Sequence, residues 1–330
     1  MTPLTGKRIL MFSPYGATKH YGVSIKRELE GRGALVYDYD ERPSQKTLTK
    51  IIIRLFRKRV PQIFDKYIQK VINKHKGERF DYILICRGEA FTPLTIGHLR
   101  TSFPGAKVIL YLWDILRTTK VEYNIGCCDR AMSFDPDDVT SHEGLLFRPT
   151  FFVPEYMEVT DNTKPNKDIV FIGTLHSNRH KLIAFLDKAF SDQGFRFFTY
   201  LFVPSPLVYI KDAVLKFPYI SIKKVHFLPI SLHDTVKVLN DAKAILDINY
   251  TGQKSLSTRA FEAMAARRKY ITTNEEVKTY DFYNPNNILV IDLKKPVIPK
   301  GFINTPFEPV REEILYKYSV KGLVDDLFEE

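Results

Sequence analysis

Short apolar segments of strand character alternate with helix-like segments along most of the 330-residue chain. The first half includes "RILMFSPY", "DYILICRGE" and "KVILYLWD", and the second half includes "DIVFIGTL", "FRFFTYLFV" and "KAILDINY". Strands that are apolar throughout and separated by helices are typical of a parallel sheet with helices on both faces. The alternation therefore predicts a doubly wound α/β fold.

The chain is longer than the roughly 250–300 residues at which a single hydrophobic core stops growing, so two domains are expected. Residues 149–168 carry three prolines and no sustained periodicity, and the alternation restarts after them. We predict one Rossmann-like domain at 1–155 and a second at 156–310. Residues 311–330 are predicted to form a terminal helix with one apolar face.

The chain has 49 Lys and Arg against 38 Asp and Glu, a net charge of +11, which favours nucleic acid, anionic lipid or phosphorylated small molecules as partners. No run approaches the ~18–20 apolar residues of a membrane-spanning helix, and the N-terminus lacks the long apolar segment of a signal peptide. Three cysteines cannot make a disulfide framework. We expect a soluble, unprocessed, cytoplasmic protein.

Two other function classes fit the sequence less well. A nucleic-acid-binding protein is not expected, because no RRM, KH or zinc pattern occurs and the cations do not alternate with exposed aromatics. A nicotinamide-dependent oxidoreductase is disfavoured because the first turn, "SPYGATKHYG", lacks the G-x-G-x-x-G pattern.

Open α/β sheets bind ligands beyond the carboxyl ends of their strands, so residues that follow strands are site candidates. In the second half, "FIGTLHSNRHK" places Gly173 and Arg179 between a strand and a helix. Glycine permits close backbone approach, the helix start offers N–H donors, and Arg179 suits a phosphate. The alternative is an ordinary turn with a solvated arginine, because the segment lacks a full P-loop pattern.

A second strand-to-helix junction reads "TGQKSLSTRAFEAMAA". Ser255 and Ser257 are both possible caps of the helix, and Lys254 and Arg259 beside free N–H donors suit a diphosphate. Glu262 shares a helix face with Thr258 and is suited to accept hydrogen bonds from sugar hydroxyls. The alternative is that Arg259 and Glu262 only pair with each other on the helix surface.

The segments "GQKSLSTRAFEAMAARRKYITTN", "YDFYNPNNILVID", "FIGTLHSNR" and "KVILYLWD" resemble the two-domain GT-B glycosyltransferases. More narrowly, they look like the CgeB-type and lipopolysaccharide or capsule biosynthesis branch. The likeness runs from about residue 80 to 292 and is most specific between 252 and 290. It implies two Rossmann-like domains facing a cleft, an acceptor-binding N-terminal domain, a donor-binding C-terminal domain and a terminal helix that crosses back.

The resemblance also implies roles in donor binding. Glu262 matches the glutamate that holds the nucleotide ribose, and Gly173 and Arg179 match the loop on the other side of the donor. The residues near the diphosphate would be Ser257, Thr258 and Arg259. Many retaining members carry another glutamate where this chain has Ser255, and the glycine that usually follows "EAMA" is replaced by "ARRK". The donor-sugar contacts and the stereochemistry are therefore left open.

The activity that this resemblance implies is transfer of a sugar from a nucleotide-sugar donor to a hydroxyl of a glycan or lipid-linked glycan acceptor. GT-B enzymes neutralise the leaving diphosphate with fixed cations and helix dipoles instead of metal. We therefore expect no cofactor beyond the nucleotide sugar as co-substrate, and no metal. A non-catalytic protein that binds a nucleotide sugar or a glycan is the alternative.

A general base for the acceptor hydroxyl would come from the first domain. Strand ends there offer Asp114, His20 and Glu89. Asp114 is favoured because "YLWD" ends a strongly apolar strand and resembles the place where relatives keep an active-site His or Asp. For each residue, a role in a turn or a helix cap is the alternative.

The segment "SFDPDDVT" contains Asp135 and Asp137 as a D-x-D, the pattern with which metal-dependent GT-A transferases hold Mn²⁺ or Mg²⁺. Asp and Pro after a strand also form an ordinary turn and helix cap. The cap is the favoured interpretation.

Residues 46–76 combine ten lysines and arginines with one acid, Asp65, and many apolar residues. Basic amphipathic helices bind anionic membranes, where lipid-linked acceptors reside, so this segment predicts peripheral contact with the inner face of the membrane. The alternative is a solvated helix packed on the sheet.

Overall fold

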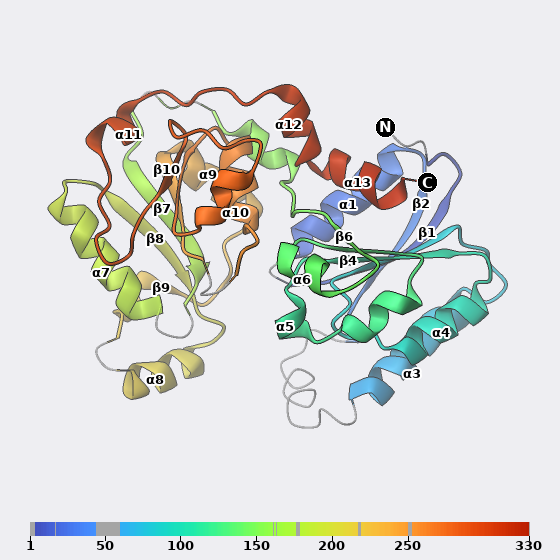
Figure 1. Ribbon diagram of the computed structural model, residues 1–330. Coiled ribbons are helices and arrows are strands. Elements are labelled where there is room, and N and C mark those ends of the chain that lie inside the picture. Colours follow the sequence, from blue (N-terminus) through green and yellow to red (C-terminus); the bar gives the residue numbers. More distant parts are fainter. Residues whose placement is uncertain are drawn as a thin grey trace. The chain divides into compact units, whose positions relative to one another are not determined.

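The computed structural model describes residues 4–16, 18–43, 60–160, 162, 164–175, 179–216, 219–249 and 253–329. The chain divides into two compact units (Figure 1). Unit 1 comprises Met1–Val153 with Tyr316–Glu330, and unit 2 comprises Pro154–Leu315. Each unit contains a six-stranded parallel sheet, as the alternation predicts.

The sheet of unit 1 has the strand order β2-β1-β3-β4-β5-β6. Its strands are β1 (Arg8–Ser13), β2 (Leu35–Asp40), β3 (Tyr82–Cys86), β4 (Lys107–Leu112), β5 (Arg130–Ser133) and β6 (Leu145–Phe147). The helices of the same unit are α1 (Lys19–Gly31), α3 (Val60–Lys74), α4 (Pro93–Ser102), α5 (Leu116–Thr119), α6 (Pro136–Ser141) and α13 (Val320–Phe328), with η2 at Glu122–Cys127.

Alternate residues of each central strand in unit 1 enter two different cores, because successive side chains of a strand point to opposite faces. Phe12 of β1 packs edge to face on Phe91, which also contacts Phe64 of α3. On the other face, Tyr82 of β3 packs on Phe328 of α13. Figure 1 shows α1 with α13 on one side of the sheet and α3 with α4 on the other. Both faces of the strands are thus buried, which explains their continuous apolar sequences.

The sheet of unit 2 has the order β12-β11-β10-β7-β8-β9. Its strands are β7 (Lys167–Thr174), β8 (Phe197–Phe202), β9 (Val225–His226), β10 (Ala242–Asp247), β11 (Lys269–Thr272) and β12 (Ile288–Val290). The remaining helices are α7 (Arg179–Asp192), α8 (Pro206–Leu215), α9 (Leu232–Asn240), α10 (Thr258–Ala265), α11 (Lys300–Asn304) and α12 (Glu312–Lys317), with short η3 (Pro154–Glu158), η4 (Ile222–Lys224) and η5 (Glu275–Thr279).

The terminal segment packs on the first domain, as the predicted crossing back requires. α13 lies against α1, and Arg32, at the end of α1, has a side chain that is only 2% exposed. Its guanidinium donates to Glu28 at 2.8 Å, to Asp325 at 2.6 Å and to the carbonyl oxygen of Lys321 at 2.7 Å. A buried arginine with these three partners fixes α13 to α1.

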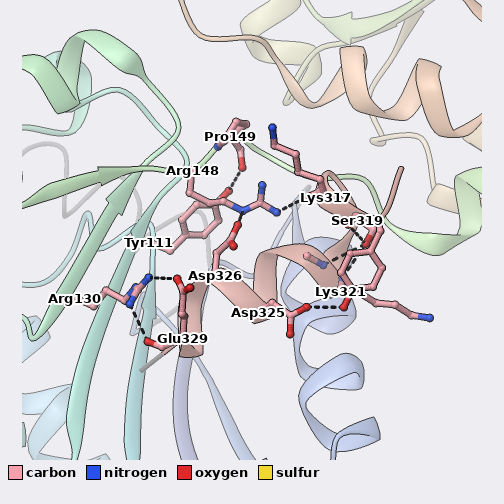
Figure 2. Close-up of polar contacts among 12 residues, drawn as sticks. Tyr111, Arg130, Arg148, Pro149, Lys317, Ser319, Lys321, Asp325, Asp326 and Glu329 are labelled. Atoms are coloured by element: carbon pink, nitrogen blue, oxygen red, sulfur yellow. Dashed lines mark hydrogen bonds and ion pairs between the residues drawn. The ribbon is translucent and has the colours of Figure 1, made fainter. Parts of the chain in front are cut away.

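A second set of polar contacts ties the terminal segment to β5 and to the residue that follows β6. Figure 2 shows Arg148 next to Lys317 and Asp326, and Arg130 next to Glu329. Arg148 donates to the carbonyl oxygen of Lys317 at 2.6 Å and lies 2.7 Å from the Asp326 carboxylate. Arg130 donates to the backbone carbonyl of Glu329 at 2.8 Å.

The terminal residues form two short helices, α12 and α13, where one helix was predicted. Ser319 begins the second helix by accepting hydrogen bonds from the backbone N–H groups of Lys321 and Gly322. A Cβ atom on Gly322 would lie 2.5 Å from the carbonyl oxygen of Tyr316. The tight turn between the two helices therefore requires glycine at 322.

Candidate functional site

The β7–β10 boundary is the point in unit 2 at which the strand order reverses. The chain runs from β7 outward to β8 and β9, and then returns to the other side of β7 with β10, β11 and β12. In open α/β sheets, this reversal leaves a crevice outside the carboxyl ends of the two central strands, and ligands bind there. Both predicted donor segments follow these two strands.

Arg179 connects the ends of the two central strands. Its guanidinium donates to the carbonyl oxygen of Thr174, at the end of β7, at 3.2 Å, and to that of Ile248, just after β10, at 3.4 Å. It also lies over the ring of Phe171, 5.7 Å from the centroid. The structure thus places this predicted phosphate-binding cation at the switch point.

Gly173 has a packing role at the same place. A Cβ atom there would lie 2.9 Å from the Phe171 ring and 3.7 Å from the Arg179 guanidinium. The missing side chain makes room for the ring on which Arg179 lies. Direct contact between Gly173 and a donor is still a prediction, and the neighbouring residues 176–178 lie outside the described part of the chain.

The start of α10 is fixed to the end of β10. Ser257 is the N-cap of α10 and accepts a hydrogen bond from the backbone N–H of Arg259 at 3.1 Å. Its hydroxyl donates to Asp247, the last residue of β10, at 2.7 Å. Tyr270 of β11 donates to the same carboxylate oxygen at 2.8 Å. Asp247 therefore orients the helix start, with Thr258 half-buried in its first turn.

The loop before α10 is held by two asparagines. Asn249 donates to the carbonyl oxygen of Gln253 at 2.5 Å. Asn274 donates to the carbonyl oxygens of Lys254 and Ser255 at 3.2 and 3.1 Å. Lys254 is exposed, whereas Ser255 is fully buried. The position where many GT-B enzymes carry a glutamate is thus part of the packing of the loop.

Arg259 and Glu262 are in contact with each other, 2.5 Å apart. This is the pairing that the alternative interpretation gives, but it is not a surface pair, because the Glu262 side chain is 0% exposed and that of Arg259 only 24%. The two residues thus form one ion pair, whereas the favoured prediction assigned Arg259 to the diphosphate and Glu262 to the ribose.

Tyr156 of η3 lies next to the buried Arg259–Glu262 pair. Its pKa is raised, chiefly because it is buried and then because of the negative charge of Glu262. The side chain is 2% exposed and lies beside both charged groups. The Arg259–Glu262 pair is therefore enclosed by the segment that precedes β7 in the sequence.

In unit 1, the strand order reverses between β1 and β3, because β2 lies on the other side of β1. Arg87 follows β3 in a left-handed backbone conformation with φ of 74°, which is rare for a residue other than glycine. Its guanidinium lies 2.6 Å from Asp114 and 2.9 Å from Glu89. Arg87 thus brings two of the three predicted base candidates together.

Asp114 is the candidate whose environment best suits a base. Burial raises its pKa, and the positive charge of Arg87 partly opposes this shift. Its side chain is still 44% exposed, so solvent has access to it. A carboxylate with a raised pKa is a stronger proton acceptor. Glu89 is 39% exposed and is held by Arg42 at 2.5 Å as well as by Arg87.

Glu41, directly after β2, lies in the same cluster of charges. Its side chain is 0% exposed, and neither carboxylate oxygen has a hydrogen-bond partner. Arg87 and Arg42 approach it only to 3.7 and 3.8 Å. Burial raises its pKa to about 8, against the opposing effect of these two arginines. Burial therefore favours the protonated form of Glu41.

His20, the third base candidate, lies on α1, with its ring 4.1 Å from that of Tyr21. The cluster around Arg87 draws its members from the ends of β2, β3 and β4. His20 lies on the helix that follows β1, and none of the ion pairs described for Arg87 includes it.

Asp135 has the capping role that the sequence favours, and Asp137 lies in the first turn of the helix that it caps. The Asp135 side chain accepts hydrogen bonds from the backbone N–H groups of Asp137 and Asp138, at 3.0 and 3.4 Å, and caps α6. Among the described residues, no group of three or more His, Cys, Asp or Glu side chains could hold a metal ion.

The basic segment 46–76 is described only from residue 60 onward. In α3, the apolar residues Phe64, Ile68 and Val71 are buried in the core of unit 1. In the described part of the segment, the apolar face therefore packs on the sheet, as the alternative of a solvated helix packed on the sheet predicts. Within the described ranges, no helix has both the length and the apolar character needed to cross a bilayer.

Sequence reasoning missed Glu41, Arg87, Tyr156 and Asp247. Asp247 ends the apolar segment "AILD" as Asp114 ends "YLWD", so the same signal could have identified it. Glu41 and Arg87 directly follow strands, which is the general sign of a site residue in this fold. Tyr156 lies in the proline-rich segment between the two domains and carries no signal of its own.

No protein-family model and no curated protein matches this chain. Solved structures match across nearly its full length. UDP-GlcNAc 2-epimerase from Methanocaldococcus jannaschii has a TM-score of 0.56 at 11% identity and covers 98% of this chain and 100% of that one. The apo form of the lipopolysaccharide outer core galactosyltransferase WaaB has a TM-score of 0.53 at 11% identity, over 98% and 99% of the two chains.

The catalytic domain of starch synthase IV from Arabidopsis thaliana, bound to ADP and acarbose, has a TM-score of 0.53 at 9% identity, over 99% of this chain and 93% of that one. Likeness at these identities concerns the fold. The chain has the two Rossmann-like units of the GT-B glycosyltransferase fold.

Proposed function

We propose that this protein is a glycosyltransferase that moves a sugar from a nucleotide-sugar donor to a hydroxyl of a surface glycan, in the CgeB-type or lipopolysaccharide and capsule branch. The observation that carries the proposal is the convergence of Arg179 and the start of α10 on the β7–β10 switch point of unit 2. A guanidinium and the open end of a helix at one switch point suit a diphosphate.

The donor would bind through its diphosphate at this edge of the sheet. Arg179 and the exposed Lys254 supply positive charge, and the first turn of α10 supplies backbone N–H groups next to Ser257 and Thr258. The names of the fold neighbours support this donor class: one is a galactosyltransferase, one carries ADP, and the M. jannaschii epimerase is also described in complex with UDP-GlcNAc and UDP.

Donor binding would exchange the partners of the buried ion pair. The Arg259 side chain would turn toward the diphosphate, and Glu262 would accept hydrogen bonds from the ribose hydroxyls. The exchange keeps both charges paired, which a buried carboxylate requires. Its partial exposure gives the Arg259 side chain a route out of the pair.

In the transfer step, the acceptor oxygen forms a bond to the anomeric carbon while the bond from that carbon to the diphosphate oxygen breaks. The electron pair leaves with the nucleoside diphosphate, whose charge Arg179, Lys254 and the α10 dipole would stabilise without a metal. Where a general base is used, the Asp114 carboxylate takes the hydroxyl proton. Arg87 orients that carboxylate.

We infer a glycan or lipid-linked glycan as the acceptor and the cytoplasm as the place of action. The basic segment 46–76 supports contact with the inner face of the membrane through its charge. Its apolar residues in α3 do not add to that support, because they are buried.

The proposal is tested with purified protein and a panel of UDP-, GDP-, CMP- and dTDP-sugars. At least one of these should raise the melting temperature and release nucleoside diphosphate when a glycan acceptor is added, with or without EDTA. Stabilisation without turnover of any acceptor would favour the non-catalytic binding protein. No stabilisation by any nucleotide sugar would contradict the donor site.

A further inference from the structure

The helix α8 of unit 2 has an apolar face that is largely exposed among the described residues. None of its ten residues is buried. Leu207, Ile210, Val214 and Leu215 are 78%, 56%, 75% and 68% exposed. Their spacing places them on one face of the helix. Figure 1 shows α8 standing apart from the sheet of unit 2.

The opposite face of α8 is anchored to unit 2, so the exposure of the apolar face is a property of the fold. Tyr209 packs on the rings of Tyr219 and Phe227, with centroids 5.5 and 6.2 Å away. Its hydroxyl donates to the carbonyl oxygen of Ile220 at 2.8 Å. Tyr209 thus anchors this side of the helix to unit 2, and the aliphatic residues of the helix remain exposed.

Two more large aliphatic residues are exposed in the segment that follows α8, Leu228 at 76% and Ile222 at 53%. We call the four exposed aliphatic residues of the helix itself the α8 surface: Leu207, Ile210, Val214 and Leu215. Soluble proteins rarely expose so many large aliphatic side chains together unless the surface binds a partner or a membrane.

The segment that contains the α8 surface has a net positive charge. Residues 204–229 contain four lysines and one acid, Asp212. Lys216 pairs with Asp212, and Lys224 pairs with Asp187. Lys211 lies on the exposed face of the helix itself, four residues after Leu207. The combination of aliphatic side chains and surrounding lysines fits the interface of an anionic bilayer.

A second copy of the chain fits this surface less well. In a symmetric dimer the same patch contacts itself, so the lysines of one copy would face those of the other. Like charges at close range oppose such association. Anionic headgroups supply the opposite charge, and the acyl region accommodates the aliphatic side chains.

We propose that the α8 surface docks this protein on an anionic lipid bilayer. α8 follows the carboxyl end of β8, and Arg179 and Ser257 lie at the same edge of that sheet. Docking therefore brings the donor residues of unit 2 close to the bilayer, where a lipid-linked acceptor would be found. That last consequence rests on the proposed function, but the docking itself does not.

The test is co-sedimentation of the full chain with vesicles at low salt. One set contains phosphatidylglycerol and phosphatidylcholine, and the other contains phosphatidylcholine alone. Wild-type protein should bind the anionic vesicles, and its affinity for them should fall as the salt concentration rises. The double variant Leu207→Gln with Val214→Gln should bind roughly tenfold more weakly, because two exposed apolar anchors are lost. Lys211→Glu should also weaken binding.

The matched control is Leu94→Gln on α4, where the wild-type leucine is 61% exposed in unit 1. It should bind vesicles as the wild type does. Two results would overturn the proposal: unchanged binding by the double variant, or a wild-type dimer in solution that the double variant dissociates. Vesicle binding that depends on α8 in a protein that no nucleotide sugar stabilises would leave the docking intact and remove the proposed function.

Discussion

The Arg259 guanidinium lies 2.5 Å from the Glu262 carboxylate, and no part of the Glu262 side chain is exposed. Two residues that the sequence assigned to different parts of a donor therefore form one buried ion pair. Both charges need a partner at all times, because an isolated buried charge is costly. In the proposed function, donor contact with Glu262 is therefore coupled to movement of Arg259.

This pairing predicts strong coupling between the two positions. Arg259→Met should lower the free energy of unfolding by about 3–5 kcal/mol, because it leaves the Glu262 carboxylate buried without its cation. Glu262→Gln in the same chain should restore much of that loss, since it removes the unpaired charge. Denaturant unfolding of the two single variants and the double variant measures the coupling. Additive losses would show that the ion pair is absent.

Glu41 predicts a pH-dependent stability. Burial raises its pKa from 4.5 to about 8, so the folded protein keeps a proton that the unfolded chain has released. The contribution of Glu41 to the free energy of unfolding should therefore be greatest below about pH 4.5. It should fall between about pH 4.5 and 8, by up to ~1.4 kcal/mol per pH unit.

Glu41→Gln is the matched variant, because it keeps the shape of the side chain and cannot ionise. Its free energy of unfolding should approach or exceed that of the wild type as pH rises from 5 to 8, and the difference should become constant above the folded-state pKa. Denaturant unfolding across this range compares the two proteins. Parallel curves for the two would mean that Glu41 ionises normally in the folded state.

The turn between α12 and α13 has no room for a side chain at Gly322. An alanine Cβ would lie 2.5 and 2.6 Å from the carbonyl oxygens of Tyr316 and Lys317, both backbone atoms. Gly322→Ala should lower the free energy of unfolding by about 1–3 kcal/mol, as overpacking does. Gly301→Ala in α11, where a Cβ would meet nothing within 4 Å, should be neutral. Equal effects in the two variants would argue against this tight turn.

If Asp114 is the base, Arg87 should affect the pH at which turnover begins. Its positive charge lowers the pKa of Asp114, in opposition to burial. Arg87→Met should therefore move the acid limb of the kcat/KM profile upward by about one pH unit. Arg117→Met, at an exposed arginine on α5, should leave the limb in place. An unchanged limb in Arg87→Met would exclude Asp114 as the titrating base.

The sequence predicted the features that follow from local patterns. Continuous apolar strands such as "KVILYL" predict two-sided burial, and the structure has it. Residues just after strands predict an arrangement at one edge of a sheet, which is why Arg179 and Ser257 both lie at the end of β10. The capping role of Asp135 follows from the Asp-Pro pair after a strand.

The features that the sequence could not predict depend on contacts between distant segments of the chain. A spacing of three residues fits either a surface pair or two separate roles for Arg259 and Glu262. Tyr156, about 100 residues earlier in the chain, packs beside the pair and contributes to its burial. Likewise, the environment of Glu41 is set by Arg87 from another strand. The break before α13 depends on the fit of Gly322 against the preceding turn.

The most direct measurement of the donor site is calorimetric titration with the nucleoside diphosphate of the best nucleotide sugar. Arg179→Gln should bind it at least roughly tenfold more weakly, because a cation at the β7–β10 switch point is lost. Lys188→Gln, on the exposed face of the same helix α7 and further from the strand ends, should bind it as the wild type does. Equal affinity of Arg179→Gln and the wild type would contradict a donor site at the β7–β10 switch point.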